Sequence, residues 1–305
     1  MSLEILKKRI QTTTDLKEIV TTMKTLSSAS VGQYEKALLS LYQYRQTVKA
    51  GFNGLMRADS FTYRPLKIRE NPNILAIVIG SDNGLVGRFN RDLMTFTEQT
   101  LNDLHPNNEK HILSIGKRIG LLAPLYHMHL EGTYPLSNSV KEISVISGVI
   151  LTKVHELILK KHIDAVYLFF NQKQGNTAFI SNYLQIIPLP QEQLSNVKKE
   201  KWNGKMAPLI SADTDILFQA LVREYLIVVL AHALTSSLAS EHYTRMMHMQ
   251  EAERNIDDSL NAFNLEYQQL RQNQITDELI DIVSGSEQIN KQKNQSVLDF
   301  LQKTG

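Results

Sequence analysis

Apolar residues recur at steps of three and four over both ends of the chain, which is the spacing of one apolar stripe on a helix. The N-terminal stripe includes Leu3, Leu6, Ile10, Val20, Met23, Tyr34, Leu38, Leu41, Val48, Phe52 and Leu55. The C-terminal stripe includes Leu217, Leu221, Tyr225, Val228, Met246, Met249, Ile256, Leu260, Phe263, Tyr267 and Leu270, and a shifted set at Ile275, Leu279 and Ile282. The two ends therefore predict amphipathic helices.

The positions of the prolines set the lengths of these helices. All eight prolines lie between Pro65 and Pro208, and proline breaks a helix interior. A continuous helix from about Ser211 to Ser284 would be about 110 Å long, several times the width of a small domain. We expect the helices of segments 1–64 and 209–305 to pair as an antiparallel coiled coil, because the middle of the chain returns between them.

The middle of the chain, residues 65–208, has a different pattern. Short apolar runs at 74–79, 112–115, 165–170 and 179–187 predict strands, and helical stretches to about Leu104 and over 143–161 lie between them. Strands that alternate with helices predict an α/β domain with a mainly parallel sheet. Residues 189–208 are interpreted as a connector or a strand edge. The domain division is thus 1–64, 65–208 and 209–305.

Composition narrows the function classes. The 305 residues carry a net charge of +2, which does not suggest nucleic-acid binding. The absence of cysteine excludes disulfides and thiolate metal sites. The longest uninterrupted apolar run of the C-terminal segment, 226–231, is far shorter than the ~20 residues that a bilayer requires. We therefore expect no transmembrane helix, and membrane association only through partners.

Candidate chemistry is sparse. The glycines Gly80, Gly84 and Gly87 follow the first strand, but their spacing is neither a dinucleotide fingerprint nor a P-loop, and no P-loop lysine follows. A structural turn is favoured over a nucleotide site. The nine histidines form no metal pattern, and His127 and His129 are expected on one face of a strand. No cofactor, metal or catalytic set is expected.

Three motifs carry a resemblance to a known family. The C-terminal blocks Leu238-Ala-Ser-Glu-His242, Arg245-Met-Met-His-Met249, Leu265-Glu-Tyr267, Arg271-Gln-Asn-Gln-Ile-Thr-Asp-Glu-Leu279 and Ile282-Val-Ser-Gly-Ser286 resemble the signature of the gamma subunit of F-type ATP synthases. Ser81-Asp-Asn-Gly-Leu-Val-Gly-Arg-Phe-Asn90 and Thr21-Thr-Met-Lys24 are similar to two further segments of that family. The resemblance is collinear over nearly the whole chain.

The resemblance implies a fold and a role. The fold is a shaft of two antiparallel terminal helices with a central Rossmann-like α/β domain. The role is the central-stalk rotor of a bacterial F-type ATP synthase, which couples ion flow to ATP synthesis or hydrolysis without a catalytic site of its own. The implied partners are the alpha and beta subunits, an epsilon-type subunit and the membrane ring of c subunits, at the cytoplasmic side of the inner membrane. The coupling ion, proton or sodium, stays open. The alternative is a non-rotary structural adaptor with a coiled-coil stalk.

The resemblance also implies contact residues. Met23, Arg245, Gln272 and Thr276 match the family's shaft positions at or near a beta-subunit loop. Arg245 and Gln272 are 27 residues apart, about seven and a half helical turns, so they lie on opposite sides of a helix and cannot form one local site on it. By default we expect Arg245 to be a solvated helix charge.

Overall fold

A computed structural model describes residues 2–58, 71–106, 108–136, 139–175, 177–190 and 209–303, together with residues 61, 69 and 202. Side chains are described as far as residue 288, except at 177 and 178. The elements in chain order are α1 (Leu3–Leu55), β1 (Asn73–Ile79), α2 (Phe89–Leu104), β2 (Lys110–Ile115), α3 (Lys117–Leu122), η1 (Ala123–Tyr126), β3 (His129–Tyr134), α4 (Val140–Lys161), β4 (Ile163–Gln174), β5 (Thr177–Ile187) and α6 (Thr214–Lys303). They form two compact units, one of Met1–Thr22 with Gln250–Gly305 and one of Met23–Met249.

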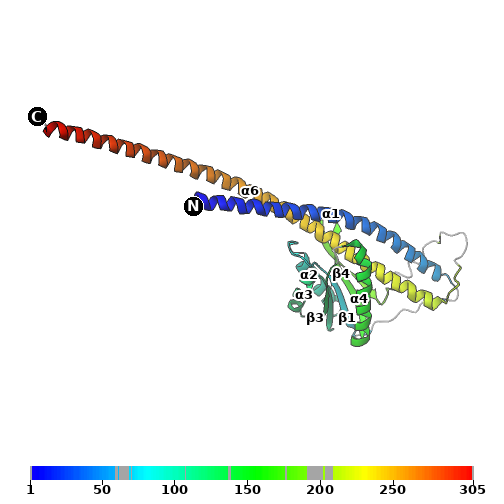
Figure 1. Ribbon diagram of the computed structural model, residues 1–305. Coiled ribbons are helices and arrows are strands. Elements are labelled where there is room, and N and C mark those ends of the chain that lie inside the picture. Colours follow the sequence, from blue (N-terminus) through cyan, green and yellow to red (C-terminus); the bar gives the residue numbers. More distant parts are fainter. Residues whose placement is uncertain are drawn as a thin grey trace. The chain divides into compact units, whose positions relative to one another are not determined.

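The larger unit is built around a five-stranded sheet with the order β3-β2-β1-β4-β5. Figure 1 labels the strands β1, β3 and β4 of this sheet. The first four strands in this order are parallel, and β5 pairs with β4 antiparallel, as in a hairpin. The prediction of a mainly parallel α/β sheet is confirmed. The strand β1 lies between β2 and β4, so the chain leaves β1 toward one side of the sheet and later returns to its other side.

Alternating residues of the strands face two separate cores, as the two-residue period of a strand requires. On one face, Ile74, Ala76 and Val78 pack with residues of α2 and α3. On the other face, Leu75, Ile77 and Ile79 pack with α4 and with residues 229–239 of α6. The helix α6 is therefore a core helix of the sheet domain.

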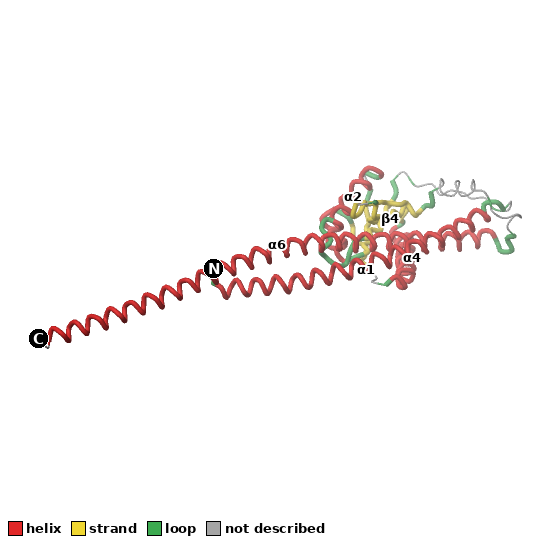
Figure 2. The backbone as a smooth tube through the Cα atoms, turned by 90° about the horizontal axis from the view of Figure 1, so that it is seen from above, coloured by secondary structure: helices red, strands yellow, loops and turns green. Residues whose placement is uncertain are grey.

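The two long helices pair antiparallel in both units (Figure 2). In the smaller unit, Lys17 of α1 pairs with Asp257 of α6 at 2.6 Å, and Arg9 stacks on Phe263. In the larger unit, Phe52 contacts Phe218 edge to face, and Tyr34 stacks on His242. Residue numbers fall along one helix as they rise along the other, which confirms the antiparallel prediction.

The start of α6 is capped by an acidic side chain. The Asp213 carboxylate accepts hydrogen bonds from the backbone N–H groups of Asp215 and Ile216 at 2.8 and 3.1 Å. The helix then continues to Lys303, past the expected end at about Ser284. The boundaries expected at 64/65 and 208/209, and most of the expected connector 189–208, lie outside the described residues.

The structure departs from the sequence analysis in three details. The segment 117–134 forms α3, η1 and the edge strand β3, which the apolar pattern did not predict. His127 is left-handed, with φ of 52°, and precedes β3, so it does not share a strand face with His129. In addition, α6 contains an 18-residue stretch of mean hydropathy 1.6, long and apolar enough to cross a bilayer by length and composition. The core helix of a soluble protein meets the same criterion, so the longest apolar run is not a sufficient test.

Candidate functional site

The carboxyl ends of β1 and β4 mark the position where α/β folds of this topology bind ligands. In an open sheet, the crevice lies where the strand order reverses, which here is between β1 and β4. The helix α6 lies across these strand ends. The Ser237 hydroxyl donates to the carbonyl of Ile79 at 3.1 Å, and the Ser240 hydroxyl approaches the carbonyl of Asn171 at 3.5 Å.

Small side chains allow this close approach. Residues 235–240 of α6 read Thr-Ser-Ser-Leu-Ala-Ser, and all six are buried. The Ser237 hydroxyl satisfies a strand carbonyl that a bound ligand or water would otherwise contact. The crevice is therefore filled by the chain's own helix.

The glycine-containing loop after β1 is a structural turn. The Asp82 carboxylate accepts hydrogen bonds from the backbone N–H groups of Lys117 and Leu136, at 2.8 and 2.9 Å. The Asn90 side chain bonds both the N–H and the hydroxyl of Ser81. The polar groups of the loop thus hold the first turn of α3 and the end of β3, which supports the structural interpretation over a phosphate cradle.

The other side of this loop rests on α6. Glu241, Arg245 and His248 lie at i, i+4 and i+7 on the helix and share one face. The Arg245 guanidinium donates to the carbonyl of Gly84 through both Nε and Nη2, at 3.4 Å each. A Cβ atom on Gly87, which has φ of +56°, would lie 2.5 Å from Nε2 of His248.

Arg245 is buried, contrary to the expectation of a solvated helix charge. It is 5 % exposed, and its Nη2 pairs with Oε1 of Glu241, itself 3 % exposed, at 2.5 Å. Burial raises the pKa of Glu241 to about 7 because desolvation disfavours its charge more than Arg245 favours it. Removing one member of a buried pair leaves the other uncompensated, which typically costs about 3–5 kcal/mol.

The remaining sequence-predicted contact residues have different surroundings. Met23 is half-buried on α1 in the larger unit. Gln272 and Thr276 are exposed on α6 in the smaller unit, where the Thr276 hydroxyl donates to the Gln272 carbonyl at 2.9 Å. The structure thus places Gln272 and Thr276 together on one turn, and Arg245 apart from them in the other unit.

One basic side chain that the sequence did not single out joins three elements. Lys173, near the end of β4, pairs with Glu35 of α1 at 2.9 Å and lies 4.5 Å above the ring centre of Tyr243 of α6. Only the folded topology brings these residues together, because 138 positions separate Lys173 from Glu35. Its position at the strand end, after an apolar run, was the only sequence signal.

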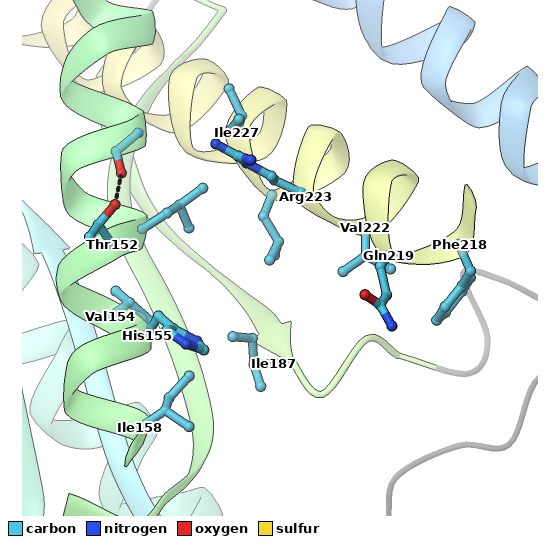
Figure 3. Close-up of a pocket in the computed structure, with 13 residues that line it drawn as sticks. Thr152, Val154, His155, Ile158, Ile187, Phe218, Gln219, Val222, Arg223 and Ile227 are labelled. Atoms are coloured by element: carbon cyan, nitrogen blue, oxygen red, sulfur yellow. Dashed lines mark hydrogen bonds between the residues drawn. The ribbon is translucent and has the colours of Figure 1, made fainter. Parts of the chain in front are cut away.

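A pocket of about 640 Å³ lies between α4, the end of β5 and the first turns of α6 (Figure 3). Its walls are mostly aliphatic, and of the described residues that line it only His155 and Arg223 are ionisable. These two do not form the paired acid and base that general acid–base hydrolysis uses. Among the described residues no group of three or more His, Asp or Glu side chains is placed to hold a metal ion.

These features define a class of protein, the helical shaft protein with an α/β head. In this class, one helix of a long antiparallel pair fills the crevice in which other α/β domains bind ligands. A family model described as ATP synthase matches residues 2–289. The chain belongs to the ATP synthase family, and within it to the gamma chains.

Relatives agree with this placement, and a solved structure shares the fold. The ATP synthase gamma chain of Geobacter metallireducens is 28% identical over 294 residues, covering 94% of this chain and 99% of the relative. That of Acetivibrio thermocellus is 25% identical over 296 residues, covering 92% and 97%. The fold is similar to a chain of the rotor of the Euglena gracilis mitochondrial ATP synthase, with a TM-score of 0.60, 14% identity, and coverage of 90% and 98%.

Proposed function

We propose that this chain is the central-stalk rotor of a bacterial F-type ATP synthase and turns inside a ring of alpha and beta subunits. Rotation would couple ion flow through the membrane sector to ATP synthesis or hydrolysis in the ring. The observation that carries this proposal is the match to gamma chains over more than nine tenths of the sequence. It favours the rotor over the non-rotary adaptor, because the matched region includes both helices and the head.

The exposed end of α6 supports an enclosing partner. In the smaller unit, Arg9 of α1 lies beside Phe263 of α6, so the antiparallel order brings the start of α1 near residue 270. Large apolar side chains beyond that level are between 48% and 68% exposed: Ile275, Leu279, Ile280, Ile282 and Val283. A contiguous set of this kind marks an interaction surface. A sleeve formed by the ring would cover it.

Met23, Arg245, Gln272 and Thr276 are the residues we propose at or near the beta-subunit contact. Gln272 and Thr276 can reach a partner without rearrangement, because both are exposed on one turn. Met23 has part of its side chain available. Arg245 is covered by its own chain, so we propose it near the contact and not in it.

We propose that the chain has no catalytic site of its own. The filled crevice between β1 and β4 and the absence of a lysine after Gly87 support this. Catalysis would then take place in the beta subunits, and residues 65–208 would act as the head on a shaft formed by residues 1–64 and 209–305.

The head would contact an epsilon-type subunit and the ring of c subunits, which would hold the complex at the cytoplasmic side of the inner membrane. The proposed binding is to protein alone, in line with a net charge of +2. Either protons or sodium ions could drive the rotor.

Coexpression of the chain with the alpha and beta subunits of the same organism tests the proposal. We expect copurification, and ATP hydrolysis that is impaired when Ile275 and Leu279 are both changed to Ser. The matched control changes Leu121 and Leu125 to Ser, a second i,i+4 pair whose side chains are 71% exposed on the head. Failure of the unchanged chain to copurify, or equal loss in both variants, would contradict the rotor assignment.

A further inference from the structure

The loop Ser81–Arg88 is held from two sides. On one side, Asp82 binds the backbone of Lys117 and Leu136 through two hydrogen bonds. On the other side, the only described side chain that donates to a loop carbonyl from α6 is that of Arg245, on Gly84. Arg245 is in turn oriented by Glu241, one turn earlier on the same helix.

We infer that Arg245 is a positioning residue, which holds the loop Ser81–Arg88 on α6 through Gly84 and thereby fixes the carboxyl edge of the head to the shaft. This inference deepens the proposed function and rests on it where it concerns coupling. It differs from a direct ring contact, for which the guanidinium would have to leave both Glu241 and Gly84.

The geometry supports positioning in three ways. The Arg245 side chain is 6% exposed and is therefore not available to a partner in this conformation. Its planar fork places Nε and Nη2 on one carbonyl oxygen, a geometry that a lysine ammonium cannot reproduce. Glu241 is 3% exposed, so the carboxylate that orients Arg245 is also removed from water.

Hydrogen exchange of the free full-length chain provides the first test. In Arg245→Gln, we expect the amides of residues 81–88 to exchange at least tenfold faster than in the unchanged chain. Arg245→Lys, which keeps the charge for Glu241, should give a smaller increase and also covers the case in which Arg245→Gln does not fold. Arg254→Gln, at an exposed arginine of the same helix, is the control and should leave the loop unchanged. Unaltered loop exchange in both Arg245 variants overturns the inference.

Coupling in the complex with alpha and beta subunits, together with the membrane sector, provides the second test. If Arg245 had only a structural role, its replacement would lower the amount of assembled complex. The ratio of ions moved to ATP hydrolysed in the assembled complex would stay the same. We expect Arg245→Lys and Glu241→Gln both to lower that ratio, and the double variant to lower it no further than the stronger single variant.

The two tests separate the possible failures. A ratio that falls with Arg245→Lys but is unaffected by Glu241→Gln assigns Arg245 a direct ring contact and overturns positioning. Failure of the unchanged chain to assemble overturns the rotor proposal, whereas the hydrogen-exchange result still decides whether Arg245 holds the loop.

Discussion

The replacement of Gly116 by alanine should destabilise the head far more than the same change at another left-handed glycine. Gly116 follows β2 with φ of 105° and ψ of 127°, a backbone conformation available essentially to glycine alone. A Cβ atom there would lie 2.9 Å from the carbonyl oxygen of Ser81 and 3.0 Å from its nitrogen. These are backbone atoms of the loop anchored by Asp82 and Asn90, so they cannot move aside as the end of a long side chain can.

The two penalties can be estimated separately. Forcing an L residue into such a conformation costs about 1–3 kcal/mol. Inserting a methyl group into a well-packed region costs about 1–3 kcal/mol more. We therefore expect Gly116→Ala to lower the free energy of unfolding by about 2–6 kcal/mol. Gly175 has φ of +55° with no atom within 4 Å of the added Cβ, so Gly175→Ala should cost only about 1–2 kcal/mol.

Urea unfolding of the full-length chain, followed by circular dichroism, measures both changes. Gly148→Ala is a second control, because Gly148 lies inside α4 with nothing within 4 Å, and alanine there should stabilise by about 0.5–1 kcal/mol. Equal destabilisation by Gly116→Ala and Gly175→Ala would refute the argument that contact with Ser81 adds to backbone strain.

Three further predictions concern charged and polar side chains. Because the pKa of Glu241 is raised from 4.5 to about 7, the folded chain keeps a proton that the unfolded chain releases, so the free energy of unfolding should fall as pH rises through this window. His242, with its pKa lowered to about 4, makes the free energy of unfolding rise with pH below pH 6.5. Between pH 6.5 and 8, the free energy of unfolding measured in urea should therefore fall by about 1 kcal/mol more in the unchanged chain than in Glu241→Gln. Parallel pH curves for the two chains would contradict this. Lys173→Met should lower the free energy of unfolding by less than about 1 kcal/mol in the same assay at neutral pH, because the lysine side chain is one third exposed. A larger loss would show that the pair of Lys173 with Glu35 is more than a surface ion pair. Gln272→Ala should change the free energy of unfolding by less than about 0.5 kcal/mol yet lower ATP-driven ion pumping in the assembled complex, and unchanged pumping would remove Gln272 from the proposed contact.

The elements that the sequence predicted are those with a strong local signal. The buried strands β1 and β4 are continuous apolar runs, and the two long helices have apolar stripes free of proline. The apolar pattern did not predict the strand β3, because it is an edge strand with no fully buried residue and therefore lacks an apolar alternation. The short helix α3 is positioned by Gly116 and by the Asp82 carboxylate, which accepts a hydrogen bond from the backbone N–H of Lys117. An apolar pattern along the chain does not reveal contacts of this kind.

The burial of Arg245 was missed for a related reason. A periodic stripe identifies one buried face of a helix, but residues 228–245 of α6 are enclosed on more than one side by the sheet, α1 and the loop after β1. A signal was present, because a helix segment that is apolar or small on all sides indicates complete enclosure. Residues 226–240 have this composition apart from His232. The arginine that follows could thus have been expected near the same enclosure.

The enclosure of α6 decides how the head and this helix can move. Val229, Leu230, Leu234 and Leu238 of α6 are at most 4% exposed and belong to the core shared with β1, β4 and α4. Burial of one such side chain contributes about 1.5–3 kcal/mol, so the four together contribute about 6–12 kcal/mol. A pair such as Lys173 with Glu35 contributes less than about 1 kcal/mol. Turning the sheet about α6 would therefore require disruption of the core, whereas the hydrogen bonds of Arg245 to the loop Ser81–Arg88 can be removed by one substitution. The sheet and the α6 segment within this unit must move as one body, and the loop at Arg245 is the part of their junction that a single substitution can open.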